Sequence, residues 1–408
     1  MGTKRQWRFD STDYRIFLSL HRNPLQSNSS IAREIGISTE SVRQRLNNLR
    51  KQRFLRPTRL INEVILGTRT QTEVEAVYAP SRLGLRRHHV LFEDIPDRRS
   101  LDMLKHICDV HPYSHYRALA YSKGATLYAQ FDIPPSIEKT MCEFYDELVR
   151  MGLARKSSQF FTNYVKGVHA DFTRWNINEN VWNLEVSKAS VGGPASIIET
   201  LWNKYMETHE NDDLTPVYPH PAFGFDRLDM LLLRELTVNA KPSVRDLATI
   251  YKRDPTNISR RLKKLRELVA PQDMLYFNRG LFDLTYTQII AGRIREGSDL
   301  TLGNLMGFIG SGTIPFDCKC VSDGSEYIVY ITTPPSLAAE FSEFFWEHTR
   351  YTGSFQLQLD SARTYYFYCE NYAGDGEWRT DKEYVYDEPL SSVLASGALE
   401  RPRAIQSH

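Results

Sequence analysis

Two stretches of the chain, KGATLYAQFDIPPS (residues 123–136) and DGSEYIVYITTPPS (residues 323–336), share one pattern at an offset of 200 residues. Each places a glycine turn before an aromatic-rich strand and closes that strand with Pro-Pro-Ser. Proline cannot donate a hydrogen bond to a neighbouring strand, and serine can cap a helix. Each stretch therefore predicts a strand followed by a helix, and an amphipathic helix is expected over 137–150 and again over 337–350.

The segments that precede these strands also repeat. Residues 30–35 and 42–51, SIAREI and VRQRLNNLRK, parallel residues 243–248 and 258–267, SVRDLA and ISRRLKKLRE. The second copy carries three extra residues between its two helices. Because two pairings occur in the same order, we expect two copies of one structural unit in the chain.

Each copy is predicted to be a small helical module followed by an α+β module. In the first copy we expect helices over 11–20, 30–36 and 38–52, with Ser11 and Ser38 as caps, and a hairpin over 58–65 and 68–78. A strand at 88–92, a helix at 98–110, strands at 115–120 and 126–131, a helix at 136–152 and a strand at 159–168 follow. This order is β-α-β-β-α-β, the ferredoxin-like arrangement.

The predicted fold class is therefore α+β, a tandem repeat of a winged helix-turn-helix and a ferredoxin-like domain. The second copy should run from Asp226 through strands at 286–293 and 354–359. The expected segments are winged helices at 1–78 and 225–280, ferredoxin-like domains at 79–170 and 281–389, a linker with one helix (195–209) at 171–224, and a disordered tail at 390–408.

Composition excludes several classes of protein. The chain has 408 residues, of which 41% are hydrophobic and 25% charged, as in ordinary globular proteins. No apolar run is long enough to cross a bilayer, and no apolar stretch follows the first basic residues as in a secretory signal. The five cysteines are an odd number spread along the chain, so a disulfide scaffold is not expected. We expect a cytoplasmic protein.

The net charge of +1 conceals local asymmetry. Residues 1–69 hold 14 Lys and Arg against 5 Asp and Glu, and residues 225–279 hold 12 against 7. Residues 370–388, in contrast, hold 2 against 7. The two basic blocks coincide with the two helical modules, which predicts a polyanionic partner for those modules.

The helix expected after Ser38 has the pattern of a DNA-recognition helix. Val42, Leu46 and Leu49 form a single apolar stripe, and the other positions are polar or basic. Such side chains can contact phosphates and base edges. We predict base contacts from Arg43, Gln44 and Asn47, and phosphate and wing contacts from Arg45, Arg50, Lys51, Arg59 and Arg69. The complete predicted set adds Ser38, Thr39, Ser41 and Asn48.

The corresponding helix of the second copy is also basic. Its preceding turn, residues 251–255, is longer and contains Pro255, so phosphate contact is expected of it rather than base reading. Its predicted DNA-binding residues are Asn257, Ser259, Arg260, Arg261, Lys263 and Lys264.

These features resemble the Lrp/AsnC (feast/famine) transcription regulators over about 150 residues of the first half. The helix-turn-helix at 30–55 and the stretch APSRLGLRRHHVLF at 79–92 carry the resemblance; His111-Pro112 and Gly124 also fit. The second copy lacks a clean Leu-Gly-Leu. The resemblance implies double-stranded DNA as partner, a small-molecule effector of unknown identity, and an intramolecular pseudo-dimer with two unequal heads. Further homo-oligomers are compatible with it.

Two other functions stay open. His115-Tyr116-Arg117 invites comparison with the siroheme decarboxylases, enzymes that act on a tetrapyrrole, although the Trp-Pro-Tyr-Asn-Leu stretch of those enzymes is absent here. Alternatively, the winged helices could bind a protein of the transcription machinery. Cys318 and Cys320 are interpreted as structural cysteines. No catalytic residue, metal site or cofactor is predicted, and the chain is expected not to be an enzyme.

Overall fold

The computed structural model describes residues 9–56, 73–184, 196–209, 214–220, 224–296 and 300–395. The chain divides into two compact units, each assembled from separate segments. Unit 1 comprises residues 1–79, 172–183 and 227–282, and unit 2 comprises residues 80–171, 184–226 and 283–408. The fold class is α+β, as the sequence predicts, with a winged helix-turn-helix at the N-terminus.

The first three helices of unit 1 are α1 (Ser11–Arg22), α2 (Asn28–Ile35) and α3 (Thr39–Lys51). Asp10, not Ser11, caps α1, because the Asp10 carboxylate accepts hydrogen bonds from the backbone N–H groups of Thr12 and Asp13. Ser38 caps α3 as predicted, and its hydroxyl accepts from the Ser41 N–H at 3.1 Å. Gly36 ends α2 at a φ of 76°, a left-handed conformation that suits glycine.

The second set of helices is α8 (Arg227–Val238), α9 (Val244–Tyr251) and α10 (Pro255–Leu268). Pro255 does not break the recognition helix. It is the first residue of α10, where proline's missing N–H costs no helical hydrogen bond, and Asp254 caps the helix. Lys252, at a φ of 52°, makes the turn between α9 and α10.

A short sheet joins the two sets of helices within unit 1. Strand β1 (Val74–Val77) pairs antiparallel with β9 (Gln272–Leu275), and an isolated bridge links Leu55 to Phe277. The sequence predicts a hairpin over 58–65 and 68–78. Residues 57–72 lie outside the described residues, and the described partner of β1 comes from the other half of the chain.

Aromatic rings fill the core beneath this sheet. Phe17 packs against Phe277 with ring centroids 4.8 Å apart and against Phe282 at 5.0 Å. Phe172 lies 4.6 Å from Phe282, so a residue of the expected linker belongs to this core. The same segment adds a two-stranded ribbon, β7 (Trp175–Asn176) and β8 (Val181–Trp182). The linker therefore contributes more than the single helix that its sequence predicts.

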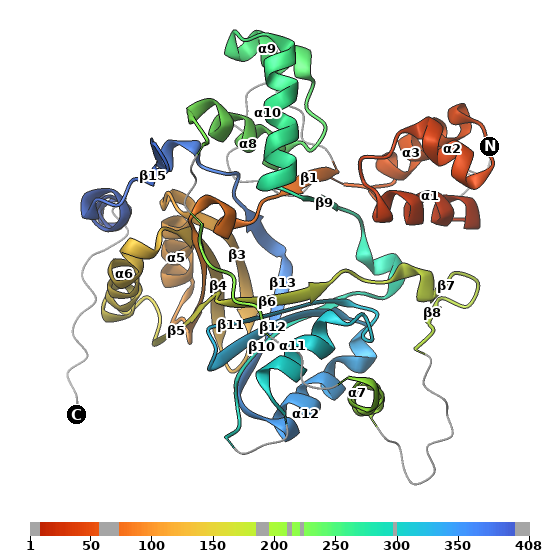
Figure 1. Ribbon diagram of the computed structural model, residues 1–408. Coiled ribbons are helices and arrows are strands. Elements are labelled where there is room, and N and C mark those ends of the chain that lie inside the picture. The colour runs from red at the N-terminus through yellow and green to blue at the C-terminus, as the bar shows by residue number, and fades with distance from the viewer. Residues whose placement is uncertain are drawn as a thin grey trace, which may run out of the picture. The chain divides into compact units, whose positions relative to one another are not determined.

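Unit 2 is built on a nine-stranded sheet of order β5-β2-β4-β3-β13-β10-β12-β11-β6 (Figure 1). The first half of the chain supplies five of these strands, β2 to β6, and the second half supplies four, β10 to β13; the antiparallel pair β3–β13 joins β5-β2-β4-β3 to the rest of the sheet. The strands are β2 (Arg86–Glu93), β3 (Ser114–Tyr121), β4 (Ala125–Ile133), β5 (Lys156–Phe161), β6 (Tyr164–Val168), β10 (Tyr286–Ile294), β11 (Asp317–Ser322), β12 (Glu326–Thr333) and β13 (Thr349–Thr364).

Except for the last, the helices of unit 2 lie between its strands along the chain in both halves. They are α5 (Arg98–Val110), α6 (Glu138–Arg150), α7 (Ile197–Thr208), α11 (Leu302–Gly310), α12 (Ala338–His348) and α13 (Glu388–Ala395). Helix α13 corrects the tail expected from residue 390, since the chain is helical to residue 395; residues 396–408 are outside the described part.

One predicted strand proves to be two. The sequence predicts a continuous strand over 159–168, but β5 pairs with β2 whereas β6 pairs with β11 at the opposite end of the strand order. The chain changes neighbour at Asn163, whose side chain donates to the Asp323 carbonyl at 2.8 Å. Hydrophobic periodicity cannot reveal such a change, because it records which face is buried and not which strand lies alongside.

The core between the two sets of strands draws on both halves of the chain. Buried Leu91 and Tyr128 from the first half pack in one cluster with Ile289, Ile328 and Phe355 from the second. The two ferredoxin-like sets of strands therefore share both a sheet and a hydrophobic core. Burial of this kind stabilises by about 25 cal/mol per Å² of apolar surface.

Candidate nucleic-acid interface

Helix α3 presents one buried and one exposed face. Val42, Leu46 and Leu49 are almost fully buried against α1 and α2. Most of the predicted DNA-binding positions lie on the exposed face, and Ser41, Arg45 and Asn48 are half-buried at its margins. The exposed members are Ser38, Thr39, Arg43, Gln44, Asn47, Arg50 and Lys51.

Glu40 holds two of the predicted base-reading side chains. The Arg43 guanidinium donates to the Glu40 carboxylate from Nε at 2.7 Å and from Nη2 at 2.5 Å, and Gln44 Nε2 donates to it at 2.9 Å. The hydrogen bonds from Arg43 and Gln44 lower the pKa of Glu40 to about 2. The arrangement orders Arg43 in the free protein and places a negative charge where a duplex would approach.

Arg45 faces inward rather than toward solvent. Its Nη1 donates to the carboxylates of Asp10 at 2.9 Å and Asp13 at 2.8 Å, and the Asp13 side chain is only 4% exposed. Arg261 makes the matching ion pair with Asp229 at 2.8 Å, and that carboxylate is 3% exposed. The sequence predicts DNA contact for both arginines; the structure places both in intramolecular ion pairs that tie α3 to α1 and α10 to α8.

Of the two basic residues at the end of α3, Arg50 makes intramolecular hydrogen bonds, whereas Lys51 is exposed to solvent. Arg50 Nε donates to Glu73, next to β1, at 3.0 Å, and Arg50 Nη1 donates to Asn47 Oδ1 at 3.4 Å. Lys51 is exposed. Arg59 and Arg69, the predicted wing residues, lie outside the described residues.

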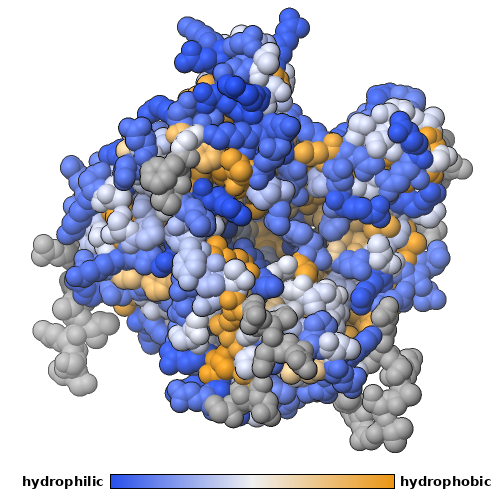
Figure 2. All heavy atoms as spheres, in the orientation of Figure 1, coloured by the Kyte–Doolittle hydropathy of each residue, from blue (hydrophilic) through white to orange (hydrophobic). Residues whose placement is uncertain are grey.

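Helix α10 has a similar but more basic exposed face. Ser259 and Arg260 are exposed, Lys263 forms a weak ion pair with Glu267 at 3.8 Å, and Lys264 is half-buried. The side chain of Asn257 accepts from Arg261 Nε at 2.9 Å, which orients Arg261 rather than a base. The surface over α9 and α10 is mostly hydrophilic (Figure 2).

Several exposed cations near α3 and α10 were not in the predicted set. Arg33 on α2 is exposed, as are Arg53 and Arg56 after α3 and Lys252 and Arg253 in the turn before α10. These five residues are part of the excess of basic residues counted in the two segments. The helical pattern of α3 and α10 did not point to them, because four of the five lie beyond the helix ends. They extend the basic surface beside α3 and beside α10.

Three buried histidines of unit 2 lie next to different partners. His88 is buried near Glu138, His89 contacts the hydroxyls of Tyr128 at 2.6 Å and Thr162 at 3.2 Å, and His111 contacts the Val385 carbonyl at 3.0 Å. Burial lowers the pKa of His111 to about 3. Arg117, which the decarboxylase comparison invokes, is paired with Asp109 at 2.7 Å.

The burial of Cys318 and Cys320 agrees with their interpretation as structural cysteines. All five are free thiols, and burial raises the pKa values of Cys318 and Cys320 in β11. A thiolate, not a thiol, is the nucleophile and metal ligand, so these sulfurs are poorly suited to either role.

One polar cluster in unit 2 contains more cations than anions. Arg87 on β2 is paired with Asp132 on β4 at 2.6 Å, and His115 lies 3.5 Å from the same carboxylate. Lys319 on β11 is close enough for its charge to influence His89 and His115. Desolvation and then the charge of Arg87 lower the pKa of Lys319 to about 8.

Comparison with known proteins identifies the N-terminal module. Residues 9–56 match the family model for winged helix-turn-helix DNA-binding. Residues 9–56 therefore form a winged helix-turn-helix DNA-binding domain. Among curated proteins, no sequence relative is found. No helix among the described residues is long and apolar enough to span a membrane.

Several solved structures are similar to this chain over about a third of its length or more. The crystal structure of the siroheme decarboxylase NirDL is similar over 94% of this chain and 100% of its own, with 12% identity and a TM-score of 0.45. B. subtilis LrpC is similar over 33% of this chain and 94% of its own, with 18% identity and a TM-score of 0.28. An AsnC family transcriptional regulator from Agrobacterium tumefaciens is similar over 37% and 88%, with 15% identity and a TM-score of 0.26.

Proposed function

We propose that this protein is a sequence-specific DNA-binding transcription regulator of Lrp/AsnC type, acting in the cytoplasm on double-stranded DNA. The observation that carries the proposal is the exposed polar and basic face of α3, over a buried apolar stripe, within a segment that matches the winged helix-turn-helix DNA-binding model. Arg43, Gln44 and Asn47 would contact base edges, and Lys51 would contact phosphate.

The two winged helices would act as unequal heads of one pseudo-dimer. Both belong to unit 1 and are joined by the β1–β9 pair and the shared aromatic core. Arg43 on α3 corresponds in the repeat to Ser259 on α10, so the two helices present different side chains at this position. Since the symmetry of a binding site mirrors that of the protein, the preferred site would contain two dissimilar half-sites.

Selection of bound fragments from genomic DNA, followed by footprinting, tests this proposal. We expect one enriched sequence motif, with two protected half-sites that differ from each other. The logarithm of the binding constant should fall linearly with the logarithm of the salt concentration. The protein releases condensed cations from DNA when it binds, and this release becomes less favourable as salt rises. Binding without sequence preference, or two identical inverted half-sites, would contradict the proposal.

Two control measurements address the other functions. If the winged helices bind a protein instead, DNA association should be undetectable or insensitive to salt. If the chain acts on a tetrapyrrole, the purified protein should show a Soret band or remove carboxyl groups from siroheme. Neither result is expected of the regulator.

We further propose that unit 2 senses an anionic effector at the cluster around Arg87, His115 and Lys319. Asp132 is paired with Arg87, and Lys319 adds a second basic side chain whose charge interacts with both, so an anion would find basic groups there. A panel of amino acids and carboxylic acids would be tested for an effect on DNA affinity. Any active compound should lose its effect in Lys319→Met, while that variant keeps the DNA affinity of the free protein.

A further inference from the structure

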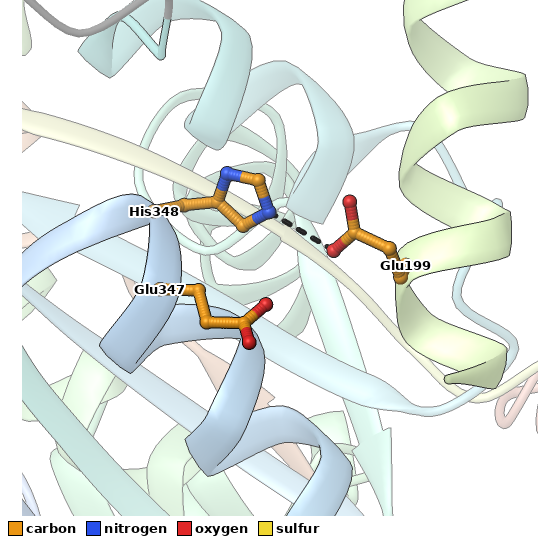
Figure 3. A group of neighbouring side chains, drawn as sticks. All are labelled: Glu199, Glu347 and His348. Carbon is orange, nitrogen blue, oxygen red and sulfur yellow. Dashed lines mark hydrogen bonds and ion pairs between the residues drawn. The ribbon is translucent and has the colours of Figure 1, made fainter. Parts of the chain in front are cut away.

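Three side chains on two helices of unit 2 converge in a way that DNA binding does not explain. Glu199 comes from the first turn of α7, and Glu347 and His348 come from the last turn of α12. One ligand atom from each lies within 4.8 Å of the others, and Figure 3 shows the two carboxylates and the imidazole directed toward a common space. The His348 Nε2 atom lies 2.9 Å from Glu199 Oε2.

The surroundings hold these groups in position. Glu340, on α12, accepts hydrogen bonds from the Ser196 hydroxyl at 3.0 Å and the Ile197 N–H at 2.6 Å, which fixes the start of α7. The His348 ring packs against Phe344, with centroids 4.7 Å apart, and against Trp202 at 6.2 Å. The apolar contacts leave the Nε2 edge of the ring directed at Glu199.

The charge of the group is unbalanced. Within the described part of the chain, Glu347 forms no ion pair and Glu199 pairs only with His348, which is positive only when protonated. Two carboxylates held this close repel each other unless a cation lies between them. A simple ion pair between the helices would need Glu199 and His348 but not Glu347.

We propose that Glu199, Glu347 and His348 bind one divalent transition-metal ion of the zinc class. Imidazole nitrogen and carboxylate oxygens are ligands that Zn²⁺ accepts, at about 2.0–2.2 Å, and three protein ligands leave a fourth position for water. Small side-chain rotations bring atoms within 4.8 Å to the spacing of such a tetrahedral site. The ion fastens α7, which lies in the segment between the two halves of the chain, to α12.

Calorimetric titration of the chelator-treated full-length chain with ZnCl₂ tests the site. We expect one ion per chain and a higher Tm in its presence, because a ligand that binds the folded state stabilises it. Glu347→Gln should weaken the affinity by at least about tenfold, the lower end of the loss seen even for groups that only support a ligand. The exposed Glu347 side chain makes this variant safe for folding, which circular dichroism would check.

Glu343→Gln is the matched control, since it removes an exposed carboxylate one turn earlier on the same helix and should bind Zn²⁺ like the unaltered chain. Substituting Co²⁺ should give the visible absorbance of a low-symmetry site with nitrogen and oxygen ligands. The absence of saturable Zn²⁺ binding, or equal affinity in Glu347→Gln, would overturn the proposal and leave an ion pair between two helices.

Discussion

Glu40 controls what Arg43 and Gln44 can contact, because its carboxylate accepts hydrogen bonds from both. To bind a guanine, Arg43 must either break its hydrogen bonds to Glu40 or donate from the N–H groups of the guanidinium that do not bond to Glu40. An exposed pair of this kind contributes little to folding stability, since water screens it. Its main effect is on the orientation of Arg43 toward DNA.

Truncation of that guanidinium gives the first prediction. Arg43→Ala should reduce affinity for the selected DNA site by about 1–3 kcal/mol and relax base preference at one position, because a bidentate base contact is lost. Fluorescence anisotropy on the selected site and on single-base variants measures both effects. Lys51→Ala is the companion variant; it should weaken binding to all sequences alike and lower the salt dependence by about one counterion.

Arg45 and Arg261 yield a prediction of the opposite kind. Arg45→Ala or Arg261→Ala should lower the free energy of unfolding by about 1–3 kcal/mol, because each leaves a buried carboxylate, Asp13 or Asp229, without its cation. Urea unfolding monitored by circular dichroism measures the loss. Arg43→Ala, on the exposed face, should stay within about 0.5 kcal/mol of the unaltered chain. An equal loss in all three variants would contradict the internal role of Arg45 and Arg261.

At the scale of elements, the β1–β9 pair connects the two sets of helices in unit 1 and contains a buried acid. Glu75 on β1 is 6% exposed, accepts a hydrogen bond from the Tyr276 hydroxyl, and has a second carboxylate oxygen without a hydrogen-bond partner. Burial raises the pKa of Glu75 to about 8. The carboxyl group is therefore protonated in the folded protein at neutral pH.

The third prediction follows from proton linkage at Glu75. Between its ordinary pKa and about 8, the folded state holds a proton that the unfolded state has released, so stability decreases as pH rises. The stabilising contribution is complete below the unfolded pKa and is lost by pH 8, at up to about 1.4 kcal/mol per pH unit. Glu75→Gln should reduce this slope between pH 5 and pH 8 in urea unfolding.

The exposed Glu179, also in unit 1, supplies the control for that measurement. Glu179→Gln should leave the pH slope unchanged, because the Glu179 side chain is exposed to solvent. A slope in Glu75→Gln equal to that of the unaltered chain would show that Glu75 is ionised in the folded state at pH 7.

At the scale of the whole molecule, each compact unit combines like modules from the two halves of the chain. Unit 1 contains both sets of three helices, α1 to α3 and α8 to α10, and unit 2 contains the sheet strands of both halves. The β1–β9 pair and the contact between Phe17 and Phe277 make the two sets of helices parts of one packed body. A duplex bound by both would be held at one spacing.

The fourth prediction tests that coupling on DNA. Inserting about 5 base pairs, half a helical turn, between the two half-sites should lower affinity strongly, because it turns one half-site to the opposite face of the duplex. An insertion of about 10 base pairs returns the second half-site to the original face of the duplex but leaves the half-sites farther apart. DNA with this insertion should therefore also bind weakly. Footprinting of the three sites measures the effect. Full affinity with the longer insertion would indicate heads that move independently.

Sequence alone determined the local structure of this protein. The apolar stripe of Val42, Leu46 and Leu49, the Ser38 cap and the Pro-Pro-Ser ends of two strands act through neighbours a few residues away, so their patterns are legible along the chain. The α+β class and the exposed face of α3 followed from them.

Only the tertiary structure decided which partners these elements take. That β1 pairs with β9, that β6 leaves β5 for β11, and that Arg45 and Arg261 bind internal carboxylates depend on residues far apart in sequence. A periodic pattern specifies which face is buried but carries no information on what buries it. The same limit hid the convergence of Glu199 with Glu347 and His348, which becomes visible only when α7 packs on α12.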